Sequence, residues 1–347
     1  MREIIIVLCL GLTGCSSSSW YQGNTHAHTN LCDHADSSPE FVAQWYHDHG
    51  YNFLILSEHN QFIDPKDVKL AEGKRDDFIL IPGEEISGVK TIHTTAMNID
   101  RLVPWDFDHD EKSAVIQNHV DGSRNAGGQA ILNHPNFQYA ISVQDMLPVE
   151  NLYMYELFNG HPDVHNEGDG EHPSTEAMWD QMLTEGMLIY GVSSDDAHHF
   201  HEISDSKSNP GRGWVMVKAA KLSADEITGA MLRGDFYASN GVFLTKCEKT
   251  QEAYSVIVDA KRTQKTLLSS PKLRGKAVED GTAGYKIEFI GPNGKVLKMF
   301  EGLEGTYTIE EADSYVRVRV TYTKEKENSG FEEYYAWGQP VFRSRES

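Results

Sequence analysis

Five short segments rich in histidine and carboxylate residues each lie at or just after the end of an apolar, β-rich run. They span residues 23–29, 57–60, 82–85, 133–135 and 194–198. If several such ends meet at one face of a fold, their imidazoles and carboxylates form one cluster. Nitrogen and carboxylate ligands of this kind suit zinc, manganese and iron. The pattern therefore predicts a site for divalent metal ions.

The runs that precede these segments alternate with helical patterns from about residue 22 to residue 245. Short β-like runs occur at 53–56, 78–81, 130–132, 153–155 and 187–190, and helical patterns occur at 38–49, 111–126 and 174–185. Such alternation favours an α/β fold in which parallel strands are covered by helices. In a barrel of this class the functional groups lie at the carboxyl ends of the strands, which is where the five segments fall.

The pattern changes after residue 245. Polar and apolar residues alternate at 255–260, 285–290, 296–300 and 315–322, and the Gly-Pro-Asn-Gly sequence at 291–294 is typical of a hairpin turn. We therefore expect a small antiparallel β domain over residues 246–347, following a catalytic domain over residues 22–245. The C-terminal segment contains no histidine, and we assign it no chemistry.

The N-terminus predicts export. An apolar run that is too short to span a bilayer ends in Leu-Thr-Gly-Cys at residues 12–15, which resembles a bacterial lipobox. This implies a signal peptide over residues 1–14 and a lipid on Cys15, with residues 15–21 as a flexible tether. The alternative is an ordinary signal peptide. The lipoprotein reading predicts a location in the bacterial cell envelope, on the periplasmic or outer-membrane face.

The composition excludes some functions and constrains others. The formal net charge of −21 disfavours binding to nucleic acids, whose phosphates the surface would repel. Once Cys9 and Cys15 are assigned to the N-terminal segment, only Cys32 and Cys247 remain, which is too few for a disulfide framework. Cys32 lies beside the first histidine segment, where a lone thiol is more often a packing residue than a ligand.

The histidines differ in their value as evidence. On a strand, side chains two residues apart project from the same face, so the pairs His26/His28 and Asp196/His198 can converge. Other histidines fall near a helix end or in polar loops, and we expect them at the surface or at the rim of the site; these are His47, His49, His161, His165, His172, His199 and His201.

Taken together, the five segments resemble the PHP metallohydrolases, a family named for polymerase and histidinol phosphatase. The resemblance covers roughly residues 20–245 and keeps the family's motif order. Residues 45–51 and 233–237 resemble more closely an exported branch that includes carbamate-type hydrolases. The resemblance implies a distorted (β/α)7 barrel that holds two or three divalent ions of zinc, manganese or iron.

The resemblance also implies a ligand set. One metal would be held by His26, His28, Glu85 and Asp196, a second by Glu85, His93 and His134, and a third by Asp33, His59 and His198. The chain has Cys32-Asp33-His34 where the family usually has Ser-Asp-Gly, so His34 could replace Asp33. It also has Glu58 where an aspartate is usual. The family's Pro-Gly-x-Glu pattern implies Glu85 as the ligand, and the side chain of Glu84 would then point to the opposite face.

The expected activity is that of a metal-dependent hydrolase. A phosphoesterase acting on a small-molecule phosphate ester through a metal-bridging hydroxide is the primary hypothesis. Arg212 could bind a substrate oxyanion, or it could be a surface arginine of a loop. Glu156 and Asn159 could line the pocket or support the ligands from behind. Two alternatives remain, namely hydrolysis of carbamate, amide or carboxylic ester bonds, and a non-catalytic lipoprotein that binds metal or glycan.

Overall fold

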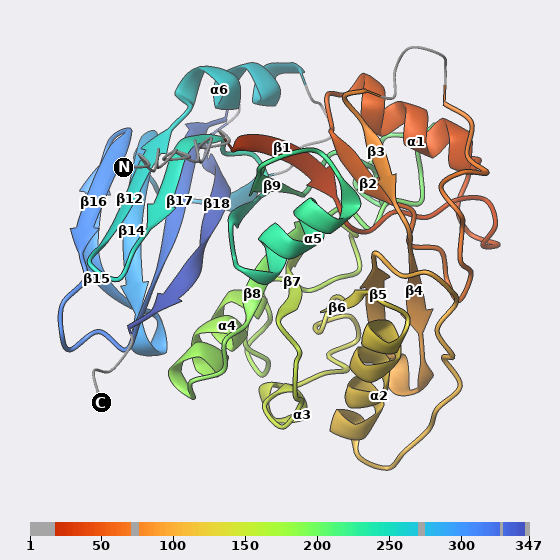
Figure 1. Ribbon diagram of the computed structural model, residues 1–347. Helices are drawn as coiled ribbons and strands as arrows, with labels where there is room; N and C mark the ends of the chain where they lie inside the picture. The colour runs from red at the N-terminus through yellow and green to blue at the C-terminus, as the bar shows by residue number, and fades with distance from the viewer. Residues whose placement is uncertain (1–17, 71–75, 270–274, 327–328, 344–347) are drawn as a thin grey trace, which may run out of the picture.

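The computed structural model describes residues 18–70, 76–269, 275–326 and 329–343, shown in Figure 1. The predicted signal peptide and Cys15 lie outside the described residues. Within the described ranges, no helix is both long enough and apolar enough to cross a membrane.

The largest described sheet has ten strands and runs through both halves of the chain. Its order is β15-β14-β17-β18-β10-β9-β1-β2-β3, with β13 paired to β18. The strands of this sheet that end before residue 245 are β1 (Ser19–Asn24), β2 (Phe53–Ile55), β3 (Ile79–Ile81), β9 (Trp214–Ala219) and β10 (Phe236–Ser239). β1, β2 and β3 pair in parallel, whereas β9 pairs antiparallel to both β1 and β10.

A second, five-stranded sheet has the order β4-β5-β6-β7-β8. Its strands are β4 (Gly83–Ser87), β5 (His93–Met97), β6 (Gln129–Leu132), β7 (Met154–Asn159) and β8 (Tyr190–Ser194). β4, β5 and β6 pair antiparallel, and β6, β7 and β8 pair in parallel.

The expected mixed α/β class is confirmed, but the distorted (β/α)7 barrel is not. The strands that end before residue 245 belong to two sheets, and several neighbouring pairs are antiparallel. The two sheets meet at isolated bridges, one between Ala27 and Ala197 and one between His59 and Glu85. All four residues lie in the histidine-rich and carboxylate-rich segments. The sheets therefore approach each other at the predicted site, without continuous strand pairing along their lengths.

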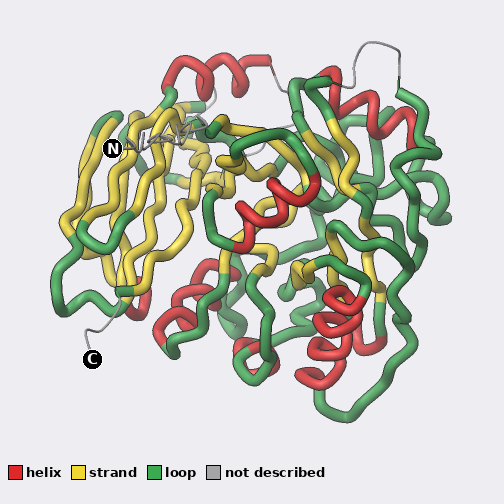
Figure 2. The backbone as a smooth tube through the Cα atoms, in the orientation of Figure 1, coloured by secondary structure: helices red, strands yellow, loops and turns green. Residues whose placement is uncertain are grey.

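The helices are short and lie around the strands, as Figure 2 shows. Three of them match the helical patterns of the sequence: α1 (Pro39–Asp48), α2 (Lys112–Asn125) and α4 (Thr175–Thr184). Ser38 caps α1 by accepting a hydrogen bond from the Phe41 amide, with Pro39 in the first turn. The others are α3 (Val143–Met146), α5 (Ala224–Leu232) and α6 (Ala260–Ser269), with 3-10 turns η1 (Val89–Thr91) and η2 (Pro292–Gly294).

The C-terminal strands are antiparallel, as their alternating pattern predicts. They are β11 (Leu244–Lys249), β12 (Ala253–Val258), β13 (Lys276–Val278), β14 (Gly284–Gly291), β15 (Lys295–Glu301), β16 (Glu304–Thr308), β17 (Tyr315–Glu325) and β18 (Phe331–Phe342). β11, β12 and β16 form a separate sheet, and η2 makes the predicted turn between β14 and β15. β18 pairs with β10, with Tyr237 opposite Gly338, so hydrogen-bonded strands cross residue 245. A domain boundary there stays a prediction.

A buried ion pair fastens α4 to the C-terminal strands. The fully buried Arg317 on β17 donates to both carboxylate oxygens of Asp180, at 2.7 and 2.6 Å. The hydroxyl of Tyr315 donates to the same carboxylate at 3.1 Å. Glu176 Oε1 also lies 2.9 Å from Arg317 Nη1, so removing Asp180 leaves the buried guanidinium with one of its two counter-ions and leaves two of its N–H groups without their acceptors. Such a loss in the interior is more costly than the loss of an exposed pair.

We therefore expect Asp180→Ala to lower the free energy of unfolding by about 3 kcal/mol. The matched control is Glu248→Ala, which breaks the solvent-exposed pair with Lys218 (3.1 Å) and should cost less than about 1 kcal/mol. Urea denaturation followed by tryptophan fluorescence measures both. Equal losses in the two variants would contradict a special role for the buried pair.

Candidate metal centre

Two histidine side chains meet at the centre of the site. His26 and His28 follow the end of β1, are fully buried, and bring their Nε2 atoms to 3.0 Å. Behind each ring, Nδ1 faces a buried carboxylate. His26 Nδ1 lies 2.8 Å from Glu156 Oε1, and His28 Nδ1 lies 3.4 Å from Glu58 Oε1.

This arrangement tests whether the site fits a cation. If each Nδ1–H donates to its carboxylate, a neutral ring carries a lone pair on Nε2. The two lone pairs then face each other at 3.0 Å, which is repulsive unless a proton or a metal ion lies between or beside them. Histidine ligands of metals commonly have their second nitrogen held in this way. The donor set therefore fits a divalent metal ion.

Carboxylates surround the two rings. Asp196 Oδ1 lies 3.3 Å from His26 Nε2 and 3.2 Å from His28 Nε2, and Glu85 Oε1 lies 3.3 Å from His26 Nε2. Burial alone would lower the pKa of His26, but the charges of Asp196, Glu156 and Glu85 raise it well above its usual value. The carboxylates thus attract positive charge to this point, and a proton and a metal ion compete for it.

Glu85 contacts three further histidines. Its Oε1 atom lies 3.2 Å from His134 Nε2 and 3.3 Å from His93 Nδ1, and its Oε2 atom lies 2.7 Å from His59 Nδ1. The same carboxylate accepts a hydrogen bond of 2.8 Å from the side-chain Nδ2 of Asn133. A single buried carboxylate therefore touches histidines that come from four separate strand ends.

Grouping by mutual distance gives three overlapping sets of ligand atoms that could hold a metal. Within each set the atoms lie within 4.8 Å of one another; the sets are His26, His28 and Asp196; His26, Glu85 and His134; and His28, Cys32, His59 and His198. The structure thus brings together the predicted ligands other than Asp33. His93 joins them through its contact with Glu85.

The third predicted position differs in detail from the expectation. Asp33 is exposed and lines a hollow at the edge of the cluster. His34 reaches further in, with its Nε2 3.2 Å from His59 Nε2 and its ring 4.7 Å from that of His198. Of the two alternatives left open by the sequence, the geometry places His34 beside the other histidines.

Glu156 lies behind the cluster, and several hydrogen-bond donors contact its carboxylate. Besides His26, its carboxylate accepts hydrogen bonds from the His134 amide (2.7 Å), the Asn159 side chain (2.8 Å) and the Ser194 hydroxyl. Burial alone would raise the pKa of Glu156, but the neighbouring His26 lowers it. The buried Glu156 carboxylate therefore holds His26 and the strand ends in position, and its contact with a substrate stays a prediction.

Arg212 also differs from the expectation. Its buried guanidinium donates to the carbonyl oxygens of Gly160 (3.0 Å) and Ser204 (2.8 Å) and to the Asn209 side chain (2.8 Å). Its backbone N–H donates to Asp195 at 2.6 Å. These contacts connect the loops that follow β7 and β8, and the contact of Arg212 with a substrate oxyanion stays a prediction.

Glu84 and Glu85 occupy opposite faces of β4, as the alternation of a strand requires. Glu84 is fully buried away from the cluster and accepts one hydrogen bond of 2.6 Å from the Val103 amide, while its Oε2 atom has no partner among the described residues. Burial raises the pKa of Glu84 to about 7.

Further residues, which the sequence analysis did not identify as site residues, form hydrogen bonds that support the cluster. Ser87 on β4 lies 2.5 Å from His59 Nδ1, and Asp195 accepts from the amides of the 211–213 turn and from the Tyr46 hydroxyl. Asp195 could have been suspected from its place beside Asp196, whereas Ser87 carries no signal. Several of the remaining histidines pack on aromatic rings, as His49 does on Trp45 and His172 does on Tyr139.

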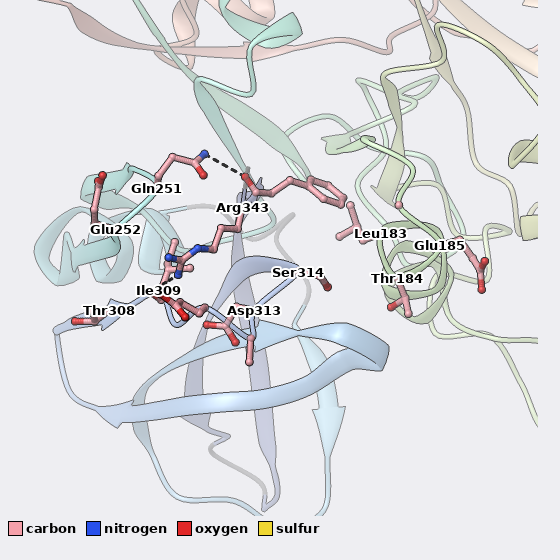
Figure 3. A pocket seen from close by; sticks show the side chains of 14 residues that line it. Leu183, Thr184, Glu185, Gln251, Glu252, Thr308, Ile309, Asp313, Ser314 and Arg343 are labelled. Atoms are coloured by element: carbon pink, nitrogen blue, oxygen red, sulfur yellow. Dashed lines mark hydrogen bonds between the residues drawn. The ribbon is translucent and has the colours of Figure 1, made fainter. Parts of the chain in front are cut away.

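A cavity of about 980 Å³ lies elsewhere, between the end of α4 and the C-terminal strands (Figure 3). Gln251 and Arg343 line it, and Gln251 donates to the Phe342 carbonyl at 3.1 Å. Its lining contains no histidine and no cysteine, so it offers none of the nitrogen ligands gathered in the cluster. We therefore place the candidate chemistry in the cluster.

Comparison with known proteins adds little to this description. No family model matches the chain, and no curated protein matches it. Among solved structures, the chain is similar to a two-domain protein from Bacteroides vulgatus that contains a predicted PHP-like metal-dependent phosphoesterase. The identity is 13%, the match covers 88% of this chain and 91% of that one, and the TM-score is 0.44.

The role assigned to Glu156 predicts a loss of metal affinity on substitution. In Glu156→Gln, the new amide group cannot accept from all four donors, so His26 loses its fixed orientation. We expect zinc affinity to fall about 10–100-fold, the usual effect of changing a group behind a metal ligand. Isothermal titration measures this, with circular dichroism to confirm folding and Glu84→Gln as the control with unchanged affinity. Equal zinc affinity in Glu156→Gln and the wild type would remove the positioning role.

The raised pKa of Glu84 predicts a pH-dependent stability. The folded state holds this proton up to a pH of about 7, whereas the unfolded chain releases it near 4.3, so folding stability falls as the pH rises between these values. Relative to the wild type, Glu84→Gln should therefore gain up to about 3 kcal/mol between pH 4 and pH 8. Urea denaturation of metal-free protein at both pH values measures the gain. A pH-independent difference would show that Glu84 titrates normally.

Proposed function

We propose that this protein is a metal-dependent hydrolase, and that its substrates are small-molecule phosphate esters. The observation that supports this most directly is that one group of ligand atoms, formed by His26, His28 and Asp196, shares His26 with a second group and His28 with a third. Such overlap suits two or three neighbouring cations of zinc, manganese or iron more than one structural ion, because a structural zinc site is normally a closed set of four ligands.

Bound divalent ions would lower the pKa of a water molecule and neutralise charge on the oxygens of a phosphoryl group. The chain's own contribution is to fix the ligands before substrate arrives. Glu156 and Glu58 orient His26 and His28, and Asn159 links Glu156 to Asp196 through hydrogen bonds of 2.8 and 3.2 Å. Because these groups are buried, their geometry does not need to reorganise during the reaction.

Access to the cluster supports a small substrate. A hollow at the surface is lined by Leu31, Cys32, Asp33, His34, His59, Gln61, Ser87 and His93. Several of the proposed ligands therefore border it directly, and an ester could reach them from this side. The acidic surface disfavours nucleic-acid phosphates as substrates.

Two further parts of the proposal rest on the sequence alone. The branch that includes carbamate-type hydrolases and the lipid anchor on Cys15 both derive from sequence resemblance, and Cys15 lies outside the described residues. The envelope location depends on that anchor. Hydrolysis at carbon, or metal binding without turnover, is kept as an outcome of the following experiment.

The test is hydrolysis of matched chromogenic phosphate monoester, phosphodiester and carboxylic ester substrates by manganese-loaded protein, with and without a chelator. We expect chelator-sensitive hydrolysis of a phosphate ester, and a loss of kcat/KM of more than about 100-fold in His26→Ala and in Asp196→Asn, because each change removes a ligand. The control is His172→Ala, which removes an exposed histidine stacked on Tyr139 and should retain activity.

The other outcomes separate the alternatives. Hydrolysis of the carboxylic ester alone would move the assignment to carbon-centred chemistry. Metal binding without turnover on any of the three substrates would favour the binding protein. Full activity in both ligand variants would overturn the proposed site itself.

A further inference from the structure

A thiol lies among the histidines of the third ligand group. Cys32 is buried, and its Sγ atom lies within 4.8 Å of ligand atoms of His28, His59 and His198. The thiol is also within hydrogen-bonding distance (3.3 Å) of the Thr29 carbonyl. The thiol therefore faces the imidazoles of the cluster while retaining a weak partner of its own.

Hydrogen bonds to Glu58 stabilise the turn that contains Cys32. The backbone N–H and the hydroxyl of Thr29 both donate to Glu58 Oε2, at 2.9 and 2.6 Å, and the Cys32 amide donates to the Thr29 carbonyl at 3.1 Å. The other oxygen of Glu58 faces His28 Nδ1. A single buried carboxylate thus positions both a metal-facing imidazole and the turn that presents the thiol.

An independent feature points to a ligand at the same place. His198 is 4% exposed, and its Nε2 atom has no hydrogen-bond partner among the described residues. Its Nδ1 atom lies 2.9 Å from the Asp196 carbonyl, which fixes Nδ1 as the donor and leaves a lone pair on Nε2. A buried nitrogen with an unused lone pair is costly in a protein interior unless something binds it.

We propose that Cys32 is a thiolate ligand of the metal position shared by His59 and His198, a position that takes a thiophilic divalent cation such as zinc. The proposal rests on the metal centre proposed above and adds a ligand to it. When the sulfur–metal bond forms, the thiol proton passes to solvent and the hydrogen bond to the Thr29 carbonyl is lost.

The distances are compatible with this ligand set. Bonds of about 2.0–2.3 Å to a tetrahedral zinc place its ligand atoms roughly 3.3–3.8 Å apart. The ligand atoms lie within 4.8 Å of one another. Side-chain rotations that move these atoms by about an ångström would bring them to the spacing of a tetrahedral zinc site. His34 Nε2, 3.2 Å from His59 Nε2, can supply the fourth ligand from the open side, where Asp33 remains exposed.

A thiolate changes which ion the position prefers. Thiolate and imidazole ligands select zinc-like ions over manganese and magnesium, which prefer oxygen ligands. We therefore expect the third position to retain zinc under conditions in which manganese exchanges. Cys247 offers a matched contrast because its Sγ atom lies 3.7 Å from the Tyr254 hydroxyl in the C-terminal strands, remote from the ligand groups.

The experiment uses the full chain with Cys9, Cys15 and Cys247 replaced by serine, so that Cys32 is the sole thiol, and compares it with the same chain carrying Cys32→Ser. Cobalt(II) is added to both, and bound cobalt is quantified. We expect a near-ultraviolet thiolate-to-cobalt charge-transfer band in the first protein and its loss in the second. The weaker ligand-field bands of cobalt bound to imidazole should persist in both.

Each other result has a distinct meaning. Cobalt that binds with ligand-field bands but without a charge-transfer band overturns the thiolate ligand and leaves the metal centre intact. A protein that binds no cobalt and no zinc overturns both this inference and the proposed function.

A second measurement does not depend on a variant folding. Wild-type protein is treated with iodoacetamide with and without zinc, and alkylation of each cysteine is followed by mass spectrometry. We expect zinc to slow alkylation of Cys32 at least tenfold and to leave Cys247 unchanged. Equal alkylation of Cys32 in zinc-saturated and metal-free protein would overturn the proposal.

Discussion

The close approach of two imidazole nitrogens is the constraint on which the rest of the structure depends. His26 and His28 place their Nε2 atoms 3.0 Å apart because a buried carboxylate lies behind each ring. Burying these carboxylates is unfavourable unless positive charge is supplied nearby. A cation between the two rings would therefore both balance the negative charge of the carboxylates and bind the lone pairs on the two Nε2 atoms.

Much of this arrangement can be predicted from the sequence, because it depends on residues that are close together in the chain. The two-residue spacing of His26 and His28 sets their common face, strand alternation separates Glu84 from Glu85, and the cap at Ser38 marks the start of α1. Pairing between distant strands has no such local signature. The antiparallel insertion of β9 beside β1, and the continuation of the sheet from β10 to β18, depend on contacts between segments far apart in the chain.

The alternatives that the sequence leaves open at single residues have the same origin. Arg212 in a glycine-rich loop could bind an anion or brace the loop, and only the positions of the carbonyls of Gly160 and Ser204 decide between the two. For Asp33 and His34, the backbone path through the turn decides which side chain reaches His59. Spacing predicts which strand end carries a functional group, but loop geometry determines which side chain of that loop points inward.

The site also connects the two sheets. The bridges between Ala27 and Ala197 and between His59 and Glu85 lie within the ligand segments, and two residues at the ends of strands, His134 and Asp196, adopt positive φ angles of 24° and 51°. Such backbone is unfavourable for residues other than glycine and persists where the surroundings enforce it. A cation bound by ligands from both sheets would favour the state in which the bridges and these turns are formed, and it would stabilise the folded chain in proportion to the logarithm of its concentration above the dissociation constant. Metal binding would therefore be coupled to the contact between the two sheets, because the same residues take part in both.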